Sequence, residues 1–178
     1  MHTNTLLAVQ DKLGGQMGVL EIQEKFEIDD SNLSFDQLVR EAPAEVAATI
    51  TEKAVLILPS HGTDDAFYSG TLDTLDFLNE NGIDADVYAN DEDYKELGLH
   101  GADIWLGTIF VKNIVIPIFC SVIGAYIFEK IRANKDDKVS VKFVVEKKDG
   151  QSSAISYDGK VENLDKAIDA VKRLGDES

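Results

Sequence analysis

A 25-residue stretch, 104–128, contains a single charged side chain, Lys112, and its last part, 114–128, contains none. A segment that is apolar on every side must be withdrawn from water, into the protein core, a partner or a membrane. This choice constrains the architecture more than any other feature. The rest of the chain has the alternating, acidic pattern of a water-exposed α/β domain.

The apolar stretch is short for a membrane span. As a helix, 114–128 would extend roughly 22 Å at about 1.5 Å per residue, whereas the hydrocarbon layer is about 30 Å thick. Extending the span back to residue 104 would bury Lys112, at a cost of about 2.5–3.5 kcal/mol. Membrane association stays an alternative, because the basic residues that follow are typical of a cytoplasmic flank: Lys130, Arg132, Lys135 and Lys138.

We therefore predict a buried apolar helix over 107–133, with two different sides. One side carries large residues that can fill a core: Ile116, Phe119, Ile123 and Ile127. The other side carries mostly small residues, which allow another backbone to approach closely. This second side is the predicted interaction surface, made of Pro117, Ser121, Gly124, Ala125 and Phe128.

A βαβ unit is predicted in the segment 53–106. The continuous apolar run 54–58 reads as a strand covered on both faces, as in a parallel sheet. Thr63 can cap a following helix, which carries Phe67, Thr71, Leu75 and Leu78 at helical spacing and ends at Gly82. A second strand follows at 84–89, and 102–106 is a candidate third strand.

The two ends of the chain complete a single domain, 1–178. The N-terminal part, 1–52, has a loosely alternating strand at 19–28, a turn at Asp29-Asp30 and a helix that Ser34 and Gln37 open as a capping box. Pro43 either starts a second helix or kinks the first. Residues 138–174 predict a ββα unit, with a hairpin turn at Asp149-Gly150. The fold class is α/β with an α+β tail.

Charge is distributed unevenly along the chain. Residues 1–103 hold 5 Lys or Arg against 22 Asp or Glu, whereas residues 104–178 are nearly balanced, with 12 against 11. An acidic first half repels phosphate backbones, so we expect no direct nucleic-acid binding and a basic protein partner fits better. The first ten residues lack the pattern of a secretory signal, which predicts a cytoplasmic protein. Cys120 is expected to be a buried structural thiol.

Motifs that carry chemistry are scarce. Ser60, His61, Gly62, Thr63 and Asp64 follow a predicted strand and precede a predicted helix, where open α/β sheets place ligand-binding loops. With the acidic loop after Ala89, they could form a pocket at the strand ends. The alternative is an ordinary turn, since Asp64 and its neighbour Asp65 would repel an anion.

No cofactor or metal site is predicted. The acidic residues around 84–96 lack the spacing of a calcium-binding loop, and the three histidines are far apart in the sequence. No nucleophile stands beside a base in a recognisable motif, so an enzymatic role is disfavoured.

The order of elements resembles a known group. The helix ending in AYIFEKIRANK, the strands KVSVKFVVEKKDG and SAISYDG, and the helix ENLDKAIDAV are similar to small bacterial proteins encoded beside effectors of antiviral conflict systems, the effector-associated constant components. The resemblance covers residues 104–174. It implies a non-catalytic accessory part of a multi-protein system, and it assigns no functional residues.

Two functions of different class follow from these observations. The first is an interaction module that docks through the apolar helix and the acidic surface onto a protein partner, either an effector or another copy of the chain. The second is a ligand-sensing or enzymatic α/β domain with a pocket near residues 59–65. A membrane-associated component through 104–128 is a further alternative.

Overall fold

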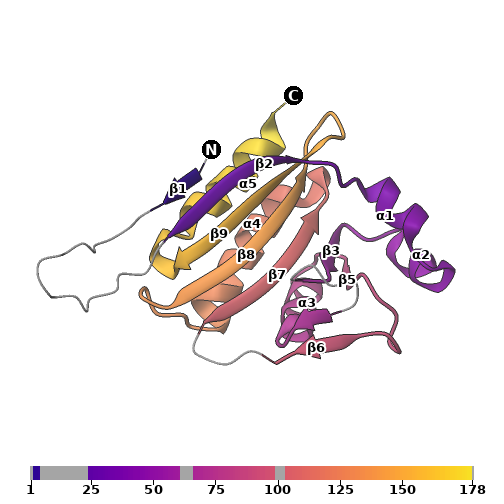
Figure 1. Ribbon diagram of the computed structural model, residues 1–178, viewed down its shortest axis with the longest axis horizontal. Coiled ribbons are helices and arrows are strands. Elements are labelled where there is room, and N and C mark those ends of the chain that lie inside the picture. The colour runs from indigo at the N-terminus through magenta and orange to yellow at the C-terminus, as the bar shows by residue number, and fades with distance from the viewer. Residues whose placement is uncertain (1, 5–23, 61–65, 99–102, 178) are drawn as a thin grey trace, which may run out of the picture.

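A mixed sheet organises the molecule. The computed structural model describes residues 2–4, 24–60, 66–98 and 103–177, and within them the strand order of the main sheet is β1-β2-β9-β8-β7-β3-β5 (Figure 1). A separate two-stranded sheet pairs β4 with β6. The strands are β1 (His2–Asn4), β2 (Lys25–Ser31), β3 (Val55–Leu58), β4 (Ala66–Tyr68), β5 (Ala85–Val87), β6 (Lys95–Leu97), β7 (Ile104–Val111), β8 (Lys138–Glu146) and β9 (Ser152–Lys160).

Helices cover the sheet unequally. Figure 1 shows α4 and α5 behind the long strands and α1 and α2 at one side. The α-helices are α1 (Phe35–Glu41), α2 (Ala44–Ile50), α3 (Thr71–Glu80), α4 (Ile116–Ala125) and α5 (Asp165–Asp176). Shorter helical turns flank them: η1 (Asn113–Val115), the π-helical η2 (Tyr126–Lys130) and η3 (Val161–Asn163).

The main core lies between the sheet and the layer formed by α3, α4 and α5. Alternate residues of β8 point into this core, because successive side chains of a strand face opposite sides. They are the four that the alternating pattern of the sequence selects, and each is at most 4% exposed: Val139, Val141, Phe143 and Val145. The large side of α4 packs onto them, with Phe119 meeting Phe143 edge to face at 5.7 Å.

A second, smaller core lies on the opposite face of the sheet. There α1 and α2 cover only β3, β7 and the adjacent part of β8, where the buried residues include Leu56, Phe110 and Val144. The remaining strands of this face, β9 and β2, are not covered by a helix of the described chain (Figure 1). This half-covered face is where a hollow forms.

Several predictions are confirmed. The fold is mixed α/β, with a βαβ unit in which β3 and β5 are parallel and flank α3, and with a C-terminal β8-β9-α5 unit. The Ser34 hydroxyl accepts a hydrogen bond from the Gln37 amide at 3.1 Å, which is one of the two bonds of a capping box, while the Gln37 side chain donates to Glu41. Pro43 starts a second helix, α2. Gly82 follows α3 with φ +88°, the left-handed conformation that glycine adopts readily.

Other predictions are wrong in detail. The turn at Asp29-Asp30 does not form, because β2 continues to Ser31 and pairs with β9 over its whole length. Phe67 belongs to β4 and not to a helix, and α3 begins only at Thr71. β3 is parallel to β5 but antiparallel to β7, so the sheet is mixed around it. The proposed cap Thr63 lies outside the described residues.

The apolar stretch is divided between a strand and a helix. The helix predicted from residue 107 begins at η1 and α4, whereas residues up to Val111 complete β7, whose neighbours are β8 and β3. A central strand with both faces covered is apolar throughout, and such a run is not distinguishable from a helix by periodicity. Lys112 lies at the junction, and its Nζ is 3.6 Å from the centroid of the Phe35 ring of α1.

A buried carboxylate ties the start of β2 to α5. Glu24 is 9% exposed and receives hydrogen bonds from Lys166 Nζ at 2.8 Å, Asn163 Nδ2 at 2.7 Å and the Tyr157 hydroxyl at 3.1 Å. Burial raises the pKa of the Glu24 carboxyl, but these hydrogen bonds and the Lys166 charge together outweigh burial and lower it. Gly159 leaves room for the Glu24 side chain, since a Cβ at this position would lie 2.6 Å from Glu24 Cγ.

Candidate functional site

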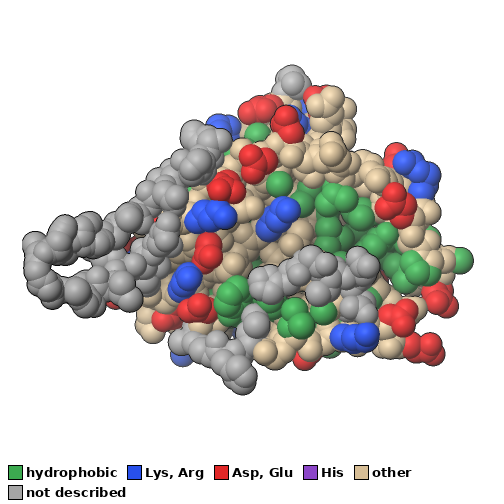
Figure 2. Space-filling model, viewed as in Figure 1, with side chains coloured by type: hydrophobic (Ala, Val, Ile, Leu, Met, Phe, Trp, Pro, Cys, Tyr) green, Lys and Arg blue, Asp and Glu red, His purple; other side chains and the backbone are tan. Residues whose placement is uncertain are grey.

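The uncovered part of the sheet is polar. Across the strands, one row runs Lys25, Asp158, Ser140, and the next runs Glu27, Ser156, Lys142, Thr108. Figure 2 shows acidic and basic side chains interleaved over these strands, while hydrophobic side chains gather on the side toward α1. Opposite charges on neighbouring strands stabilise a sheet modestly, by about 0.2–1 kcal/mol per pair.

A hollow of about 480 Å³, which we call the sheet hollow, lies over these rows. Its size is within the range of small-molecule sites, about 300–1,000 Å³. The wall beside β3 is partly apolar, whereas the floor is polar. Its lining residues are Lys25, Glu27, Leu33, Leu58, Pro59, Ser60, Tyr68, Gly107, Thr108, Ser140, Val141, Lys142, Ser156, Tyr157 and Asp158.

An irregularity in β7 shapes one wall. The register of β7 against β8 shifts between Trp105 and Gly107, and Gly107 has φ +78°. A Cβ at Gly107 would be 2.9 Å from Ser60 Oγ and 3.4 Å from a Tyr68 ring carbon, so only glycine fits here without displacing the wall. Bulges of this kind are frequent beside binding sites, where they redirect side chains.

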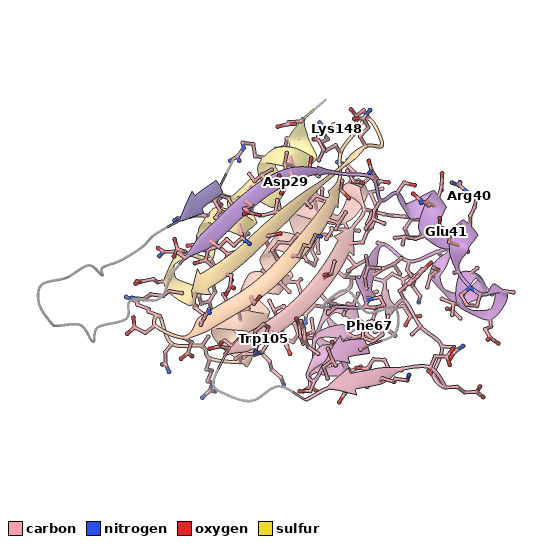
Figure 3. The ribbon with its side chains drawn as sticks, viewed as in Figure 1. Asp29, Arg40, Glu41, Phe67, Trp105 and Lys148 are labelled. Carbon is pink, nitrogen blue, oxygen red and sulfur yellow. The ribbon has the colours of Figure 1, made fainter. Side chains whose placement is uncertain are left out.

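Aromatic rings support the same wall from outside. Tyr68 and Trp105 pack with their ring centroids 5.2 Å apart, and Figure 3 shows Trp105 at the end of β7. Phe67, the neighbour of Tyr68, points to the other side and stacks on Tyr94 at 5.0 Å. Burial raises the pKa of the Tyr68 hydroxyl, and the negative charge of Asp158 raises it further.

The charges of the hollow are only partly paired. Lys25 and Glu27 form an ion pair at 3.8 Å, and Lys138 Nζ lies 3.5 Å from Asp158 Oδ1. That Oδ1 atom is buried, yet it accepts no hydrogen bond. Within the described part of the chain, the Lys142 side chain makes neither an ion pair nor a hydrogen bond.

The predicted ligand loop contributes one described residue to this site. Ser60 lies in the sheet hollow and is 3% exposed. His61, Gly62, Thr63 and Asp64 lie outside the described residues. The acidic loop after Ala89 contributes no described lining residue.

The sequence did not predict the polar residues that dominate the hollow. The outward positions of the two alternating strands β8 and β9 hold Lys142, Ser156 and Asp158. Along a strand, polar and apolar residues alternate in the same way whether the polar side chains face bulk water or a concave surface. The described lining contains no histidine or cysteine, and its polar groups are Lys, Asp, Glu, Ser, Thr and Tyr side chains.

The predicted interaction surface lies on the other side of the molecule, on the outer side of α4. Ile114 is 82% exposed, Ile118 54% and Phe128 44%, and with the exposed Pro117 and Ser121 they form what we call the α4 ridge. Gly124 and Ala125 are half-buried at its margin. The large residues of the opposite side are buried, as predicted.

An acidic edge borders this ridge. Asp73, Asp76 and Glu80 are exposed along α3 at positions i, i+3 and i+7, one side of a helix. Phe77, on the same side, packs against Tyr126 of η2 with ring centroids 5.2 Å apart, which places this edge beside the α4 segment. Burial raises the pKa of Tyr126, and the Asp73 charge adds to the shift while the Thr74 hydrogen bond opposes it.

Comparison with protein-family models, curated proteins and solved structures finds no match to this chain. Among the described residues, no group of His, Cys, Asp and Glu side chains is arranged to hold a metal ion. Within the same residues, one helical segment, Asn113–Lys130, is long and apolar enough to cross a membrane by length and composition, and 39% of it is buried. The core helix of a water-soluble protein meets the same criteria.

Proposed function

We propose that the chain is a non-catalytic docking module, an accessory component of a bacterial multi-protein system that acts in the cytoplasm. It binds a protein partner through the α4 ridge and the acidic edge of α3. The partner presents an apolar strip flanked by Lys or Arg side chains. The resemblance to effector-associated components favours an effector as this partner.

The observation that carries the proposal is the exposure of large apolar side chains along one segment. Ile114, Ile118, Phe128 and Ile131 all belong to it, and the one further exposed large hydrophobic side chain among the described residues, Leu72, is on the adjacent α3. Full burial of one fully exposed side chain of this kind contributes about 1.5–3 kcal/mol, and since these four are 37–82% exposed, a partner that covers them all gains about twice that. Contiguous exposed apolar surface of this kind marks interaction sites.

The acidic edge favours a protein over a membrane as the occupant. Asp73, Asp76 and Glu80 border the ridge and carry three negative charges, which anionic lipid headgroups repel. A basic rim on a protein partner instead pairs with them and orients the docking. The basic residues Lys130 and Arg132 flank Ile131 at the C-terminal end of this segment, whereas its border along α3 is acidic.

The first test uses a synthetic amphipathic helix with a leucine strip flanked by lysines, and measures its binding by fluorescence anisotropy. We expect Ile118→Glu to weaken binding at least about 10-fold, which corresponds to about 1.4 kcal/mol. Asp76→Lys should weaken it as well, by reversing a rim charge. Ala48→Glu, on the exposed side of α2, is the matched control and should bind as the native chain does. Equal binding by all four proteins would refute the proposal.

Two further measurements separate the other occupants. Flotation with vesicles of phosphatidylglycerol and phosphatidylcholine should leave the protein unbound, and stable flotation that Ile118→Glu abolishes would assign the ridge to a membrane. Sedimentation equilibrium should show a monomer. A dimer that Ile118→Glu dissociates would assign the ridge to a second copy of the chain and overturn the proposal of a basic partner.

A second candidate function, small-molecule sensing, is favoured by the sheet hollow. The hollow and the α4 ridge lie on opposite faces of the sheet, so the two sites can be tested separately.

A further inference from the structure

We propose that the sheet hollow binds a small zwitterion of the amino-acid type, with its carboxylate on Lys142 and its ammonium on Asp158. The inference concerns a different face from the α4 ridge and does not depend on the docking function. It rests on the charges, the register and the apolar wall of the hollow.

The charge balance selects a ligand with both signs. Four charged side chains are among the described lining residues, the cations Lys25 and Lys142 and the anions Glu27 and Asp158. Lys25 pairs with Glu27 at 3.8 Å and Asp158 pairs with Lys138 at 3.5 Å, so Lys142 is the one of these four that has no ion pair within the described residues. A plain anion would meet two carboxylates beside Lys142, and a plain cation would meet two ammonium groups. A ligand with separated charges satisfies both.

Asp158 supplies the acceptor for the positive end. Its Oδ1 is covered by protein atoms and lies 3.5 Å from Lys138 Nζ, but the side chain as a whole is 43% exposed, so the other carboxylate oxygen can accept from a ligand ammonium. An α-ammonium carries three N–H donors, of which one suffices.

The register places the two groups at a suitable separation. Lys142 is directly opposite Ser156 on β9, and Asp158 is two residues further along the same strand. Diagonal neighbours of this kind have Cα atoms about 7–8 Å apart. The short gap between the ends of an amino acid, plus a charged contact of about 2.7–2.9 Å at each end, spans the distance between the side-chain tips.

Hydroxyl groups lie between and beside the two charged residues. Ser140 pairs with Asp158 and Thr108 with Lys142 in the sheet register, and Ser156 lies between Glu27 and Lys142. These hydroxyls can donate to a carboxylate or accept from an ammonium, since each has one donor and two acceptor sites. The polar floor therefore serves both ends of the ligand.

The apolar wall of the hollow indicates which kind of side chain the amino-acid ligand carries. Leu33, Leu58 and Pro59 line the hollow on the side of α1 and β3, and Tyr68 faces it from β4. An aliphatic side chain buried against this wall contributes favourably, whereas a charged one would be desolvated without a partner. We expect leucine and valine to bind more tightly than glutamate and lysine.

The experiment is a titration of the full chain with L-leucine and L-valine, by calorimetry and by ¹⁵N chemical-shift mapping. We expect saturable binding, with the largest shifts at the amides of Thr108, Lys142 and Ser156. Lys142→Met and Asp158→Asn should each weaken binding at least 10-fold. The exposed Lys148→Met and Asp169→Asn are matched controls and should leave the affinity unchanged.

Half-ligands test the need for both charges. Isovalerate is valine without the ammonium and isobutylamine is valine without the carboxylate, and each should bind at least 10-fold more weakly than valine. Isovalerate binding as tightly as valine would overturn the zwitterion in favour of a simple anion site. Absence of saturable shifts in the native chain with either amino acid would overturn the proposal without relying on any variant. Either result leaves the α4 docking proposal intact, because that ridge is on the opposite face.

Discussion

The Glu24 cluster gives a quantitative prediction that depends on pH. Glu24→Gln keeps the size of the side chain but removes the charge that Lys166, Asn163 and Tyr157 solvate. Hydrogen bonds to a charged group contribute about 1.5–3 kcal/mol each, and breaking a buried ion pair costs about 3–5 kcal/mol. The Lys166 side chain is 44% exposed and can turn to water, so the expected loss is smaller, about 2 kcal/mol at pH 7.

The sign of the pH dependence follows from the lowered pKa of Glu24. The folded protein binds the Glu24 proton more weakly than the unfolded chain, in which the carboxyl has its ordinary pKa of 4.5. The stabilisation is therefore complete above about pH 4.5 and is lost as the pH falls through the lower folded-state pKa. The difference between the native chain and Glu24→Gln should shrink in the same window.

The assay is urea denaturation of both proteins at pH 7 and at a series of lower pH values. The control is Glu27→Gln on the same strand, whose ion pair with Lys25 is surface-exposed and should contribute less than about 1 kcal/mol. A difference for Glu24→Gln that stays constant down to the acid end of the series would refute the assignment of its effect to the carboxylate charge. If Glu24→Gln left the free energy of unfolding unchanged at pH 7, the predicted size of its effect would be refuted.

Two further predictions concern single residues near the α4 segment. Arg132 has φ +60°, a conformation that costs non-glycine residues about 1–2 kcal/mol. Arg132→Gly should therefore raise the free energy of unfolding by up to about 1 kcal/mol, after the conformational entropy that glycine loses on folding is subtracted. Lys130→Gly, inside η2, is the control and should lower the free energy of unfolding. Cys120 is 3% exposed and burial raises the pKa of its thiol to about 11, so a disulfide reagent should label it at pH 8 only in urea, and rapid labelling of the folded chain would contradict this packing.

The strands that alternate were the easiest to predict. β8 has apolar residues at every second position, and Asp149-Gly150 indicates where the chain turns back. The turn that forms is not centred on this dipeptide: Lys148 and Asp149 are its central residues, and Gly150 follows them with φ +88°. The Ser34 cap and the apolar stripe of α5 are similarly local signals. In each case a few neighbouring residues determine the structure, so no knowledge of distant contacts was needed.

The division of the apolar stretch was not predictable by the same means. Ile109, Phe110 and Val111 are apolar because β8 and β3 flank them and helices cover both faces, which is a property of the assembled sheet. β4 was missed for a related reason, since Phe67 fits a helical spacing while its pairing partner, Glu96 on β6, is far along the chain. Tertiary context overrides local preference at both places.

The candidate site was predicted only in part. Ser60 was identified because it follows a buried strand, and the structure places it in the sheet hollow. Lys142 and Asp158 were not identified, because their positions become concave only when α1 and β4 frame an otherwise open sheet face. The exposed face of α4 could be anticipated, since an apolar helix with small and large sides indicates two different neighbours.

The position of β2 has a consequence for how the chain is made. Its neighbours in the sheet are β1 and β9, and β9 ends at Lys160, more than a hundred residues further along. During synthesis β2 must therefore leave the ribosome and remain unpaired with β9 until β9 has emerged as well. Closing such a long loop is slow, and an exposed strand edge is prone to aggregation meanwhile. Acidic residues on this strand, Asp29 and Asp30 among them, keep the waiting segment hydrated.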